Sequence, residues 1–370
     1  MKKIVIYILR FCLNIIYFFM KFRVTKPGKV LFLSRQSNEI SLDFRMIQEE
    51  LSKREEWIEI VTICNRLEGE NSGGLLSFAR DTLRSMYHMA NSGVVVLDSY
   101  WPAISLLRHK DGMTVIQIWH ALGKIKKSGY QTIGKEGGRD KDIANLMRMH
   151  KGYDYIIAGG KAWNDAYIGS FGTTEDKLIN CGLPRIDYLI NTEEEKEVEI
   201  YSKYKEFIGK KVVLYAPTFR RNIKDPKPYA MKLMEALNSN DIVFIVKSHP
   251  NQFVGIPDTC PEFSTDELLS VADYCITDYS ATAVEAAILG VKTLYYVYDF
   301  EDYSSKNGMN INLYDEMPGC VFEDANELAE VVKNDNYNIE ALARYQEKFL
   351  PEELGTSTEK ICDLILANIG

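Results

Sequence analysis

Two histidines stand where expected strands give way to loops. His120 closes the run TVIQIWH at 114–120, and His249 lies in VKSHP, directly after the run IVFIV. A neutral imidazole, with an ordinary pKa of about 6.5, can accept a proton from a hydroxyl group near neutral pH. Either histidine could instead simply complete the packing at a sheet edge. The chain has five histidines in all, however, and two at strand ends favour a chemical role.

A phosphate-binding turn is indicated in CITDYSATAVEAAILG, residues 275–290. An expected strand ends at Thr277 and Asp278, and a helix of small residues follows Ser280, Ala281 and Thr282. Unpaired N–H groups and the helix dipole at such a start attract phosphate oxygens, and the two hydroxyl groups add donors. The same sequence also fits a simple helix N-cap, and Asp278 is better suited to orienting the loop than to catalysis.

Basic side chains follow other expected strands and are candidates for phosphate contacts. Arg185 follows the turn CGLP and Arg220 follows LYAPTF, and a guanidinium forks readily onto a phosphate. Arg185 could instead form a local cap with Asp187. Three lysines after His120 would meet the phosphates of an acceptor or lie on a solvated loop: Lys124, Lys126 and Lys127.

Several common site motifs are missing from the sequence. It contains no GxxxxGK[ST] phosphate loop, no GxGxxG fingerprint, no GxSxG elbow and no HExxH pair. These absences argue against a classical dinucleotide oxidoreductase. The seven cysteines form no CxxC pair, and no carboxylate spacing typical of a metal site stands out. We therefore expect reduced cysteines, and neither a metal nor a cofactor is predicted.

The elements that must position these residues alternate between strand and helix. Apolar runs at 29–34, 57–64, 93–98, 114–120, 153–159 and 177–182 read as strands, and a second series lies at 212–217, 242–250, 272–278 and 292–298. This β-α-β pattern is typical of parallel sheets covered on both faces. It predicts an α/β chain of two Rossmann-like domains, 27–190 and 208–370 with terminal helices, separated by a cleft in the GT-B manner. Ligands in such sheets bind beyond the carboxyl ends of the strands.

Residues 1–26 differ from the rest of the chain. They carry six basic side chains and no acidic one around the apolar run 4–20, whereas the whole chain has a net charge of −8. Lys3, Arg10, Asn14 and Lys21 fall on one helical stripe. The pattern predicts an amphipathic helix lying in an anionic membrane surface on the cytoplasmic side, with the stripe towards the headgroups. A true span and a helix packed on protein are the alternatives. The charge pattern gives no support for nucleic-acid binding.

Six motifs in order resemble one enzyme family, the CDP-glycerol glycerophosphotransferases of teichoic-acid synthesis. They are WHALGKIKKSGY, GLPRID, LYAPTFR, KSHP, ITDYSA and YDFEDYSSKNGMNINLYDEMPG, and the resemblance extends from about residue 29 to the C-terminus. It implies a GT-B-like fold, peripheral membrane attachment and a polyprenyl-diphosphate-linked acceptor. Two departures concern phosphate contacts and alditol choice: Asn307-Gly308 replaces a frequent Arg-Gly, and Ser280-Ala281 replaces a double serine.

The resemblance also implies residue roles. His120 would be the catalytic base, and His249, with Lys247 beside it, would contact the pyrophosphate of the donor. Further donor-site positions are Arg185, Arg220, Thr277, Asp278, Ser280 and Ala281. A loop expected to meet the alditol or the cytidine contains Asp299, Asp302 and Tyr303.

The resulting hypothesis is transfer of glycerol phosphate or ribitol phosphate from CDP-glycerol or CDP-ribitol to a lipid-linked saccharide acceptor. The chain length resembles that of short, primase-like members of the family. A nucleotide-sugar glycosyltransferase or epimerase of the same fold is the alternative, and a non-catalytic membrane scaffold is a second one. A homo-oligomer is compatible with the sequence.

Overall fold

The computed structural model describes residues 2–66, 72–135, 138–220, 223, 225–249 and 252–369. The chain divides into two compact units. Unit 1 comprises Met1–Ala121, Ser128–Arg185 and Thr356–Gly370, and unit 2 comprises Leu122–Lys127 and Ile186–Gly355. Each unit is built around a parallel sheet, which confirms the predicted α/β class.

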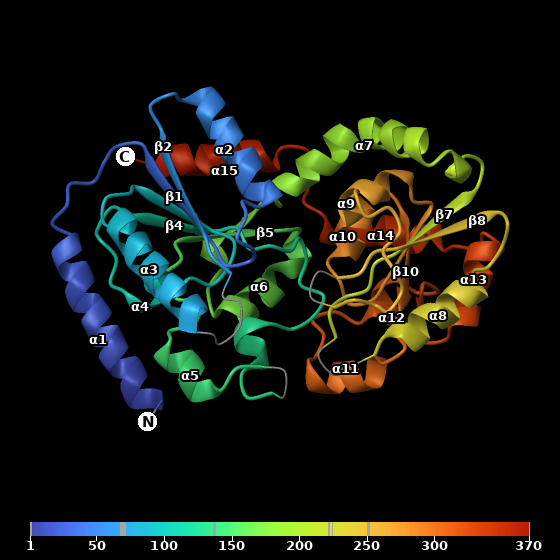
Figure 1. The fold of residues 1–370 in the computed structure, drawn as a ribbon, viewed down its shortest axis with the longest axis horizontal. Coiled ribbons are helices and arrows are strands. Elements are labelled where there is room, and N and C mark those ends of the chain that lie inside the picture. The colour runs from blue at the N-terminus through green and yellow to red at the C-terminus, as the bar shows by residue number, and fades with distance from the viewer. Residues whose placement is uncertain are drawn as a thin grey trace. The chain divides into compact units, whose positions relative to one another are not determined.

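The described part of unit 1 contains a six-stranded sheet in the order β2-β1-β3-β4-β5-β6 (Figure 1). The strands are β1 (Lys29–Ser34), β2 (Glu59–Cys64), β3 (Val94–Leu97), β4 (Thr114–Gln117), β5 (Tyr155–Ala158) and β6 (Leu178–Asn180). All neighbours pair in parallel. Because helices cover the sheet, β1 and β3 are buried along their whole length, which is why they read as unbroken apolar runs.

The helices of unit 1 are α1 (Lys2–Met20), α2 (Leu42–Arg54), α3 (Ser72–Met89), α4 (Pro102–Leu106), α5 (Lys141–Leu146), α6 (Asn164–Phe171) and α15 (Ser357–Asn368). Figure 1 shows α2 and α15 side by side, with α3 and α4 on the other face of the sheet. The Sγ of Cys362 in α15 donates to the carbonyl of Ile47 in α2 at 3.7 Å. The last helix therefore packs in unit 1, whereas the sequence placed residues 208–370 together in a second domain.

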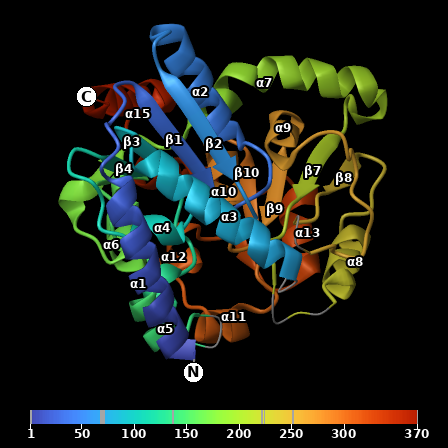
Figure 2. The same cartoon turned by 60° about the vertical axis from the view of Figure 1, so that its left-hand side comes forward.

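Unit 2, as far as it is described, contains a five-stranded parallel sheet in the order β11-β10-β9-β7-β8. The strands are β7 (Lys211–Tyr215), β8 (Ile242–Val246), β9 (Tyr274–Thr277), β10 (Lys292–Tyr296) and β11 (Val321–Phe322). The helices are α8 (Lys227–Ala236), α9 (Thr265–Leu268), α10 (Thr282–Ile288), α11 (Phe300–Lys306), α12 (Leu313–Glu316), α13 (Ala325–Lys333) and α14 (Ile339–Phe349). Figure 2 shows α8 and α13, which pack together, and α13 also contacts β10 and β11.

The charged stretch between the two expected domains, residues 191–207, is largely helical. It forms most of α7 (Pro184–Lys203), which begins in unit 1 and continues in unit 2. Its acidic and basic side chains are solvated or paired, as in the ion pair of 2.8 Å between Lys196 and Glu199. A helix with few apolar residues is hard to recognise from periodicity, which explains why the sequence indicated only a junction.

Strand order reverses once in each sheet, and this fixes where ligands can bind. In unit 1 the chain runs from β1 to β2 on one side and then to β3 on the other side of β1. In unit 2 it runs from β7 to β8 and then to β9 on the other side of β7. The two connections leave the sheet in opposite directions, so a crevice opens at the carboxyl ends of the flanking strands. The loops after β1, β3, β7 and β9 are therefore the places to look for a site.

Helix α1 has the opposite orientation to the one predicted. Asn14 donates to the carbonyl of Leu106 at 3.3 Å, Lys21 donates to the carbonyl of His109 at 3.0 Å, and Lys3 pairs with Asp142. The polar stripe thus contacts the protein. It does so because the carbonyls at and after the end of α4 lack partners within that helix. The exposed side of α1 is apolar and includes Ile4, Tyr7, Ile8, Phe11, Ile15, Phe18 and Phe19.

A separate question is whether any helix could cross a bilayer. No helix among the described residues is both long enough and apolar enough to span a membrane.

A buried carboxyl group follows β3 in unit 1. Asp98 is 2% exposed, and neither of its carboxyl oxygens accepts a well-aligned hydrogen bond from a described residue. Burial raises its pKa to about 6, and the nearby hydroxyls of Ser34 and Ser99 offset only part of that rise. A carboxyl whose pKa is higher in the folded state favours folding while it is protonated. That contribution is lost as the pH rises from about 4 to 6.

Asp98→Asn is therefore expected to stabilise unit 1 at neutral pH but not in acid. The amide stays neutral, so the variant should gain about 2 to 3 kcal/mol in free energy of unfolding between about pH 4.5 and pH 7.5, relative to the unmodified chain. Urea titrations of both proteins at the two pH values measure this difference. Since the comparison is between pH values, any pH-independent effect of the amide cancels. An equal difference at both pH values would show that Asp98 does not titrate in this range.

Candidate functional site

In unit 1 the structure holds His120 by its Nδ1 atom. This nitrogen lies 3.0 Å from the backbone carbonyl of Asp98 and 3.1 Å from Nε2 of Gln36. Asp98 follows β3 and Gln36 follows β1, so the imidazole sits at the point where the strand order reverses. The carbonyl can only accept a proton from Nδ1, whereas the Gln36 amide nitrogen can only donate one to it. In the tautomer that donates to the carbonyl, Nε2 is an acceptor, which is the state that a general base requires.

The residue before this histidine has an unusual backbone. Trp119 has a φ of 62°, in the left-handed region that side chains with a Cβ rarely occupy. Its N–H donates to Oε1 of Gln117 at 2.9 Å, and Gln117, fully buried, donates in turn to the carbonyl of Ser99 at 3.1 Å. The indole also lies 4.1 Å from the His120 ring, centroid to centroid. Strain of this kind persists where the surroundings enforce it, often at functional sites.

In unit 2 a buried arginine organises the loops after β7 and β9. Arg220 is 2% exposed, and its guanidinium lies 2.9 Å from Asp278 and 3.2 Å from Asp299. Burial alone would lower its pKa, but the two carboxylates outweigh burial and raise it. Rings of three tyrosines surround the guanidinium at 4.5 to 5.3 Å: Tyr279, Tyr298 and Tyr303. The sequence predicted a phosphate ligand here, and the structure shows a charge already balanced by two carboxylates.

The same carboxylates shape the neighbouring backbone. Asp278 accepts hydrogen bonds from the N–H of Thr218 at 3.0 and 3.1 Å and from the N–H of Tyr279 at 2.6 Å. Asp299 accepts from the hydroxyl of Tyr279 at 3.3 Å, and burial raises the pKa of Asp299 although Arg220 opposes the rise. Asp278 thus orients the loop, as expected from the sequence.

The turn after β9 presents two hydroxyl groups. The Oγ of Ser280 and the Oγ1 of Thr282 lie 3.1 Å apart, and Ser280 accepts from the N–H of Thr282 at 3.3 Å. Ala281 immediately precedes α10. Thr277, in contrast, is fully buried and donates to the carbonyl of Ala216 at 2.7 Å, so its hydroxyl serves the sheet.

His249 and Arg220 are connected through a glutamine. The carbonyl of His249 accepts from the N–H of Gln252 at 2.8 Å, and Oε1 of Gln252 accepts from the N–H of Arg220 at 2.6 Å. The His249 ring lies 5.9 Å from that of Phe219. Lys247 turns elsewhere, towards the Cys260 carbonyl at 3.4 Å and Asp258 at 3.8 Å.

The lysines after His120 do not all lie on a solvated loop. Residues 122–127 group with unit 2, where Asn310 donates to the carbonyls of Lys124 and Lys126 at 2.7 and 3.2 Å. Burial lowers the pKa of Lys124 to about 7. Lys126 donates to the hydroxyl of Thr218 at 2.9 Å, and burial lowers its pKa against the opposing charge of Asp278. Lys127 is half-buried, and its N–H donates to the carbonyl of Gly308 at 3.0 Å.

Two other predicted positions pair with charged side chains of helices: Arg185 with α2, and Asp302 within α11. Arg185 forks onto Asp43 of α2, with Nη2 at 2.5 Å and Nε at 3.1 Å from the same carboxyl oxygen. Asp43 lies in another helix, 142 residues away in sequence. Asp302 pairs with Lys306 one turn along α11 at 2.7 Å.

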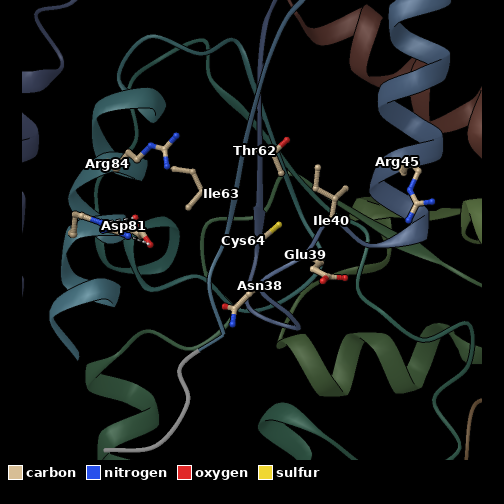
Figure 3. Close-up of a pocket in the computed structure, with 10 residues that line it drawn as sticks. Asn38, Glu39, Ile40, Arg45, Thr62, Ile63, Cys64, Asp81 and Arg84 are labelled. Atoms are coloured by element: carbon tan, nitrogen blue, oxygen red, sulfur yellow. Dashed lines mark hydrogen bonds and ion pairs between the residues drawn. The ribbon is translucent and has the colours of Figure 1, made fainter. Parts of the chain in front are cut away.

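A hollow of about 710 Å³ lies around the edge strand β2, away from these residues (Figure 3). Arg84 of α3 and Arg45 of α2 stand on opposite sides of the strands in this view, so they do not converge on one ligand. Asp81, also in α3, already pairs with Arg80 at 3.2 Å. None of the residues singled out from the sequence lines this hollow. Among the described residues no cluster of three or more His, Cys, Asp or Glu side chains is arranged to hold a metal.

Comparisons with known proteins agree with the motif order. A sequence model of the family described as CDP-Glycerol:Poly(glycerophosphate) glycerophosphotransferase matches residues 15–367. The chain is 28% identical over 360 residues to the teichoic acid poly(ribitol-phosphate) polymerase of Bacillus spizizenii, covering 92% of this chain and 56% of that protein. It is 27% identical over 355 residues to the teichoic acid ribitol-phosphate primase of the same organism, covering 91% of this chain and 90% of that one.

The fold has a counterpart among solved structures. The H548A variant of the wall teichoic acid polymerase TagF superposes with a TM-score of 0.75 at 20% identity, covering 100% of this chain and 96% of that one. This likeness concerns the fold and confirms the GT-B-like prediction. Since the family model matches nearly the whole sequence, the chain belongs to the CDP-glycerol:poly(glycerophosphate) glycerophosphotransferase family.

Proposed function

We propose that this chain transfers glycerol phosphate or ribitol phosphate from a CDP-activated donor to a hydroxyl group of a lipid-linked teichoic-acid acceptor, releasing CMP. The observation that carries the proposal is the family match over residues 15–367. The family description names a glycerophosphotransferase, and the two relatives are named for ribitol phosphate, so both alditols are candidates. The chain spans about half of the polymerase and nearly all of the primase, which favours a short, primase-like product.

In the proposed reaction the acceptor hydroxyl oxygen attacks the β-phosphorus of the donor. A new oxygen–phosphorus bond forms while the bond from that phosphorus to the bridging oxygen breaks, and CMP leaves with the bridging oxygen. The hydroxyl proton passes to Nε2 of His120. The 3.0 Å contact between Nδ1 and the Asp98 carbonyl is compatible with this role, because a histidine that donates from Nδ1 has Nε2 as its acceptor.

Residues of unit 2 are proposed to hold the donor. The hydroxyls of Ser280 and Thr282, together with His249, would contact the diphosphate and stabilise the charge that develops on its oxygens. Asp299, Asp302 and Tyr303 are proposed for the alditol or cytidine side. Arg220 would act as a positioning residue, since its guanidinium already pairs with Asp278 and Asp299. Lys126, through Thr218, belongs to the same network rather than to the acceptor side.

The exposed face of α1 is proposed to attach the protein to an anionic membrane surface on the cytoplasmic side. Its phenylalanines and isoleucines face away from the protein, and burying such side chains in the acyl region is favourable. Basic groups gather at the C-terminal end of the helix. Lys110 donates to the carbonyl of Arg23. Burial lowers the pKa of Lys21, and the nearby charge of Arg108 lowers it further. Such a group of basic side chains suits anionic headgroups.

The first test is release of CMP from CDP-glycerol and CDP-ribitol, each with and without a lipid-linked disaccharide acceptor. Acceptor-dependent CMP from either donor would establish the reaction and identify the alditol. No CMP from either donor, with an acceptor shown to be active with another enzyme, would favour a sugar-nucleotide enzyme or a scaffold.

His120→Ala is expected to lower turnover about a hundredfold or more, because the acceptor hydroxyl loses its proton acceptor. Steady-state CMP release at saturating substrates measures this. His88→Gln is the matched control. His88 contacts Lys29, the first residue of β1, and therefore lies at the amino ends of the strands of the same sheet, whereas His120 lies at their carboxyl ends. Undiminished turnover of the alanine variant would exclude His120 as the base.

Phe18→Glu is expected to weaken binding to vesicles that contain phosphatidylglycerol, since a charge would enter the acyl region. Co-sedimentation with vesicles measures the bound fraction. Phe18 is 57% exposed, so the change should leave the fold intact. Val198→Glu, at a 70% exposed position of α7, provides a control for added charge. Equal binding of both variants would show that α1 does not face the membrane.

A further inference from the structure

Two arginines of unit 1 meet at Tyr100, in the loop after β3 whose Asp98 carbonyl contacts His120. Arg35 directly follows β1, and Arg139 lies just before α5. Tyr100, which follows β3, connects them: Nη1 of Arg35 donates to the Tyr100 carbonyl at 3.3 Å, and the Arg139 guanidinium lies 5.6 Å from the Tyr100 ring centroid. Neither arginine forms an ion pair with a carboxylate of the described residues. No sequence motif singled out Arg35.

Arg35 bears an electrostatic cost that its contacts with Tyr100 and Phe78 compensate only in part. Its guanidinium packs 5.0 Å from the Phe78 ring, and its Nε atom is buried without a hydrogen-bond partner among the described residues. Burial lowers its pKa, and the positive charge of Arg139 lowers it further. A partly desolvated cation next to a second cation is unfavourable unless an anion joins them.

The position of this pair relates it to the reaction. The Arg35 N–H donates to Oγ of Ser99 at 2.8 Å, and the next residue, Gln36, contacts Nδ1 of His120. Arg35, Tyr100 and His120 therefore lie at the same reversal of strand order, between β1 and β3, where open α/β sheets bind ligands. Unit 2 offers a contrast, since its buried Arg220 has two carboxylates within 3.2 Å.

We propose that Arg35 and Arg139 form an anion site that holds a phosphate group of the acceptor next to the hydroxyl that His120 deprotonates. A guanidinium pair matches phosphate oxygens in both charge and geometry. The site recognises the phosphate and leaves open which one: the diphosphate of the lipid, or an alditol phosphate already on the acceptor. This inference rests on the proposed function and adds an acceptor-binding site to it.

The test compares Arg35→Gln and Arg139→Gln with the unmodified chain in KM for acceptor and donor. Each variant is expected to raise the acceptor KM about tenfold while leaving the donor KM unchanged, as loss of a charge-assisted hydrogen bond predicts. Arg84→Gln is the matched control, an exposed arginine of the same unit that lies beside β2 (Figure 3). Arg139 is also exposed, so its variant should fold even if that of Arg35 does not. An unchanged acceptor KM in Arg139→Gln would overturn the proposal.

Two acceptors distinguish the source of the phosphate. A tenfold effect confined to an acceptor that already carries one alditol phosphate assigns the site to that phosphate. An equal effect on an acceptor without it assigns the site to the lipid diphosphate. Both results support the anion site, and no effect with either acceptor contradicts it.

A binding measurement keeps the inference independent of turnover. Calorimetric titration with inorganic pyrophosphate should give weaker binding to Arg35→Gln and Arg139→Gln than to the unmodified chain and to Arg84→Gln. This result would support the site even if no CDP-alditol proved to be a substrate. Equal pyrophosphate binding by all four proteins would exclude an anion site at these arginines.

Discussion

Parallel strand pairing with one reversal of order is the constraint on which the rest of each unit depends. Because β1 lies between β2 and β3, and β7 between β8 and β9, the carboxyl ends of these strands border a crevice in each sheet. Short loops then need to carry only a few polar side chains to make a site. The His120 imidazole is held by residues after β1 and β3, and the Arg220 guanidinium by residues after β7 and β9.

The two crevices differ in how they treat charge. In unit 2, Arg220 pairs with Asp278 and Asp299 inside a tyrosine cage, and the backbone N–H groups of Thr218 and Tyr279 complete the carboxylate contacts. The charges of this network are balanced within the unit, although the Arg220 guanidinium nitrogens form no well-aligned hydrogen bond with a described residue. In unit 1, Arg35 and Arg139 pair with no carboxylate of the described residues, and a strained tryptophan precedes the imidazole. Unit 2 therefore carries counter-charges for its buried arginine, while in unit 1 the proposed anion would supply them.

Much of the fold was predictable because the buried strands are short, apolar and separated by turn residues. The strand 29–34 matches β1 residue for residue, and Ser41 caps α2 as expected, accepting from the N–H of Phe44. The predicted strand 114–120 was too long at its C-terminal end. The observed strand β4 stops at Gln117, and the backbone of Trp119 is in the left-handed region. The return of α15 to unit 1 could not be predicted, because local periodicity does not say which sheet an amphipathic helix covers.

Within the site, motif order located His120, His249 and the turn after β9, but not how far each side chain is buried. The burial of Arg220 and Lys124 in unit 2 depends on long-range contacts with the segments after β10. The pairing of Arg185 with Asp43 of α2 is likewise a long-range contact. Gln36, Gln117 and Asp98 were missed because each is an ordinary residue in the sequence. Their positions at or just after the ends of β1, β4 and β3 were the available signal.

The packing of α15 on α2 has a consequence for the order in which the chain can fold during synthesis. Unit 2 is complete once residue 355 has emerged from the ribosome, whereas unit 1, which starts earlier, still lacks its last helix. Until then the buried side chains of α2, such as Ile47 and Leu51, have no cover on that side. The usual sequence, in which the N-terminal domain folds first, is therefore reversed for the final step. A released chain that ends at residue 355, with unit 2 intact, should engage chaperones through unit 1, the part made first.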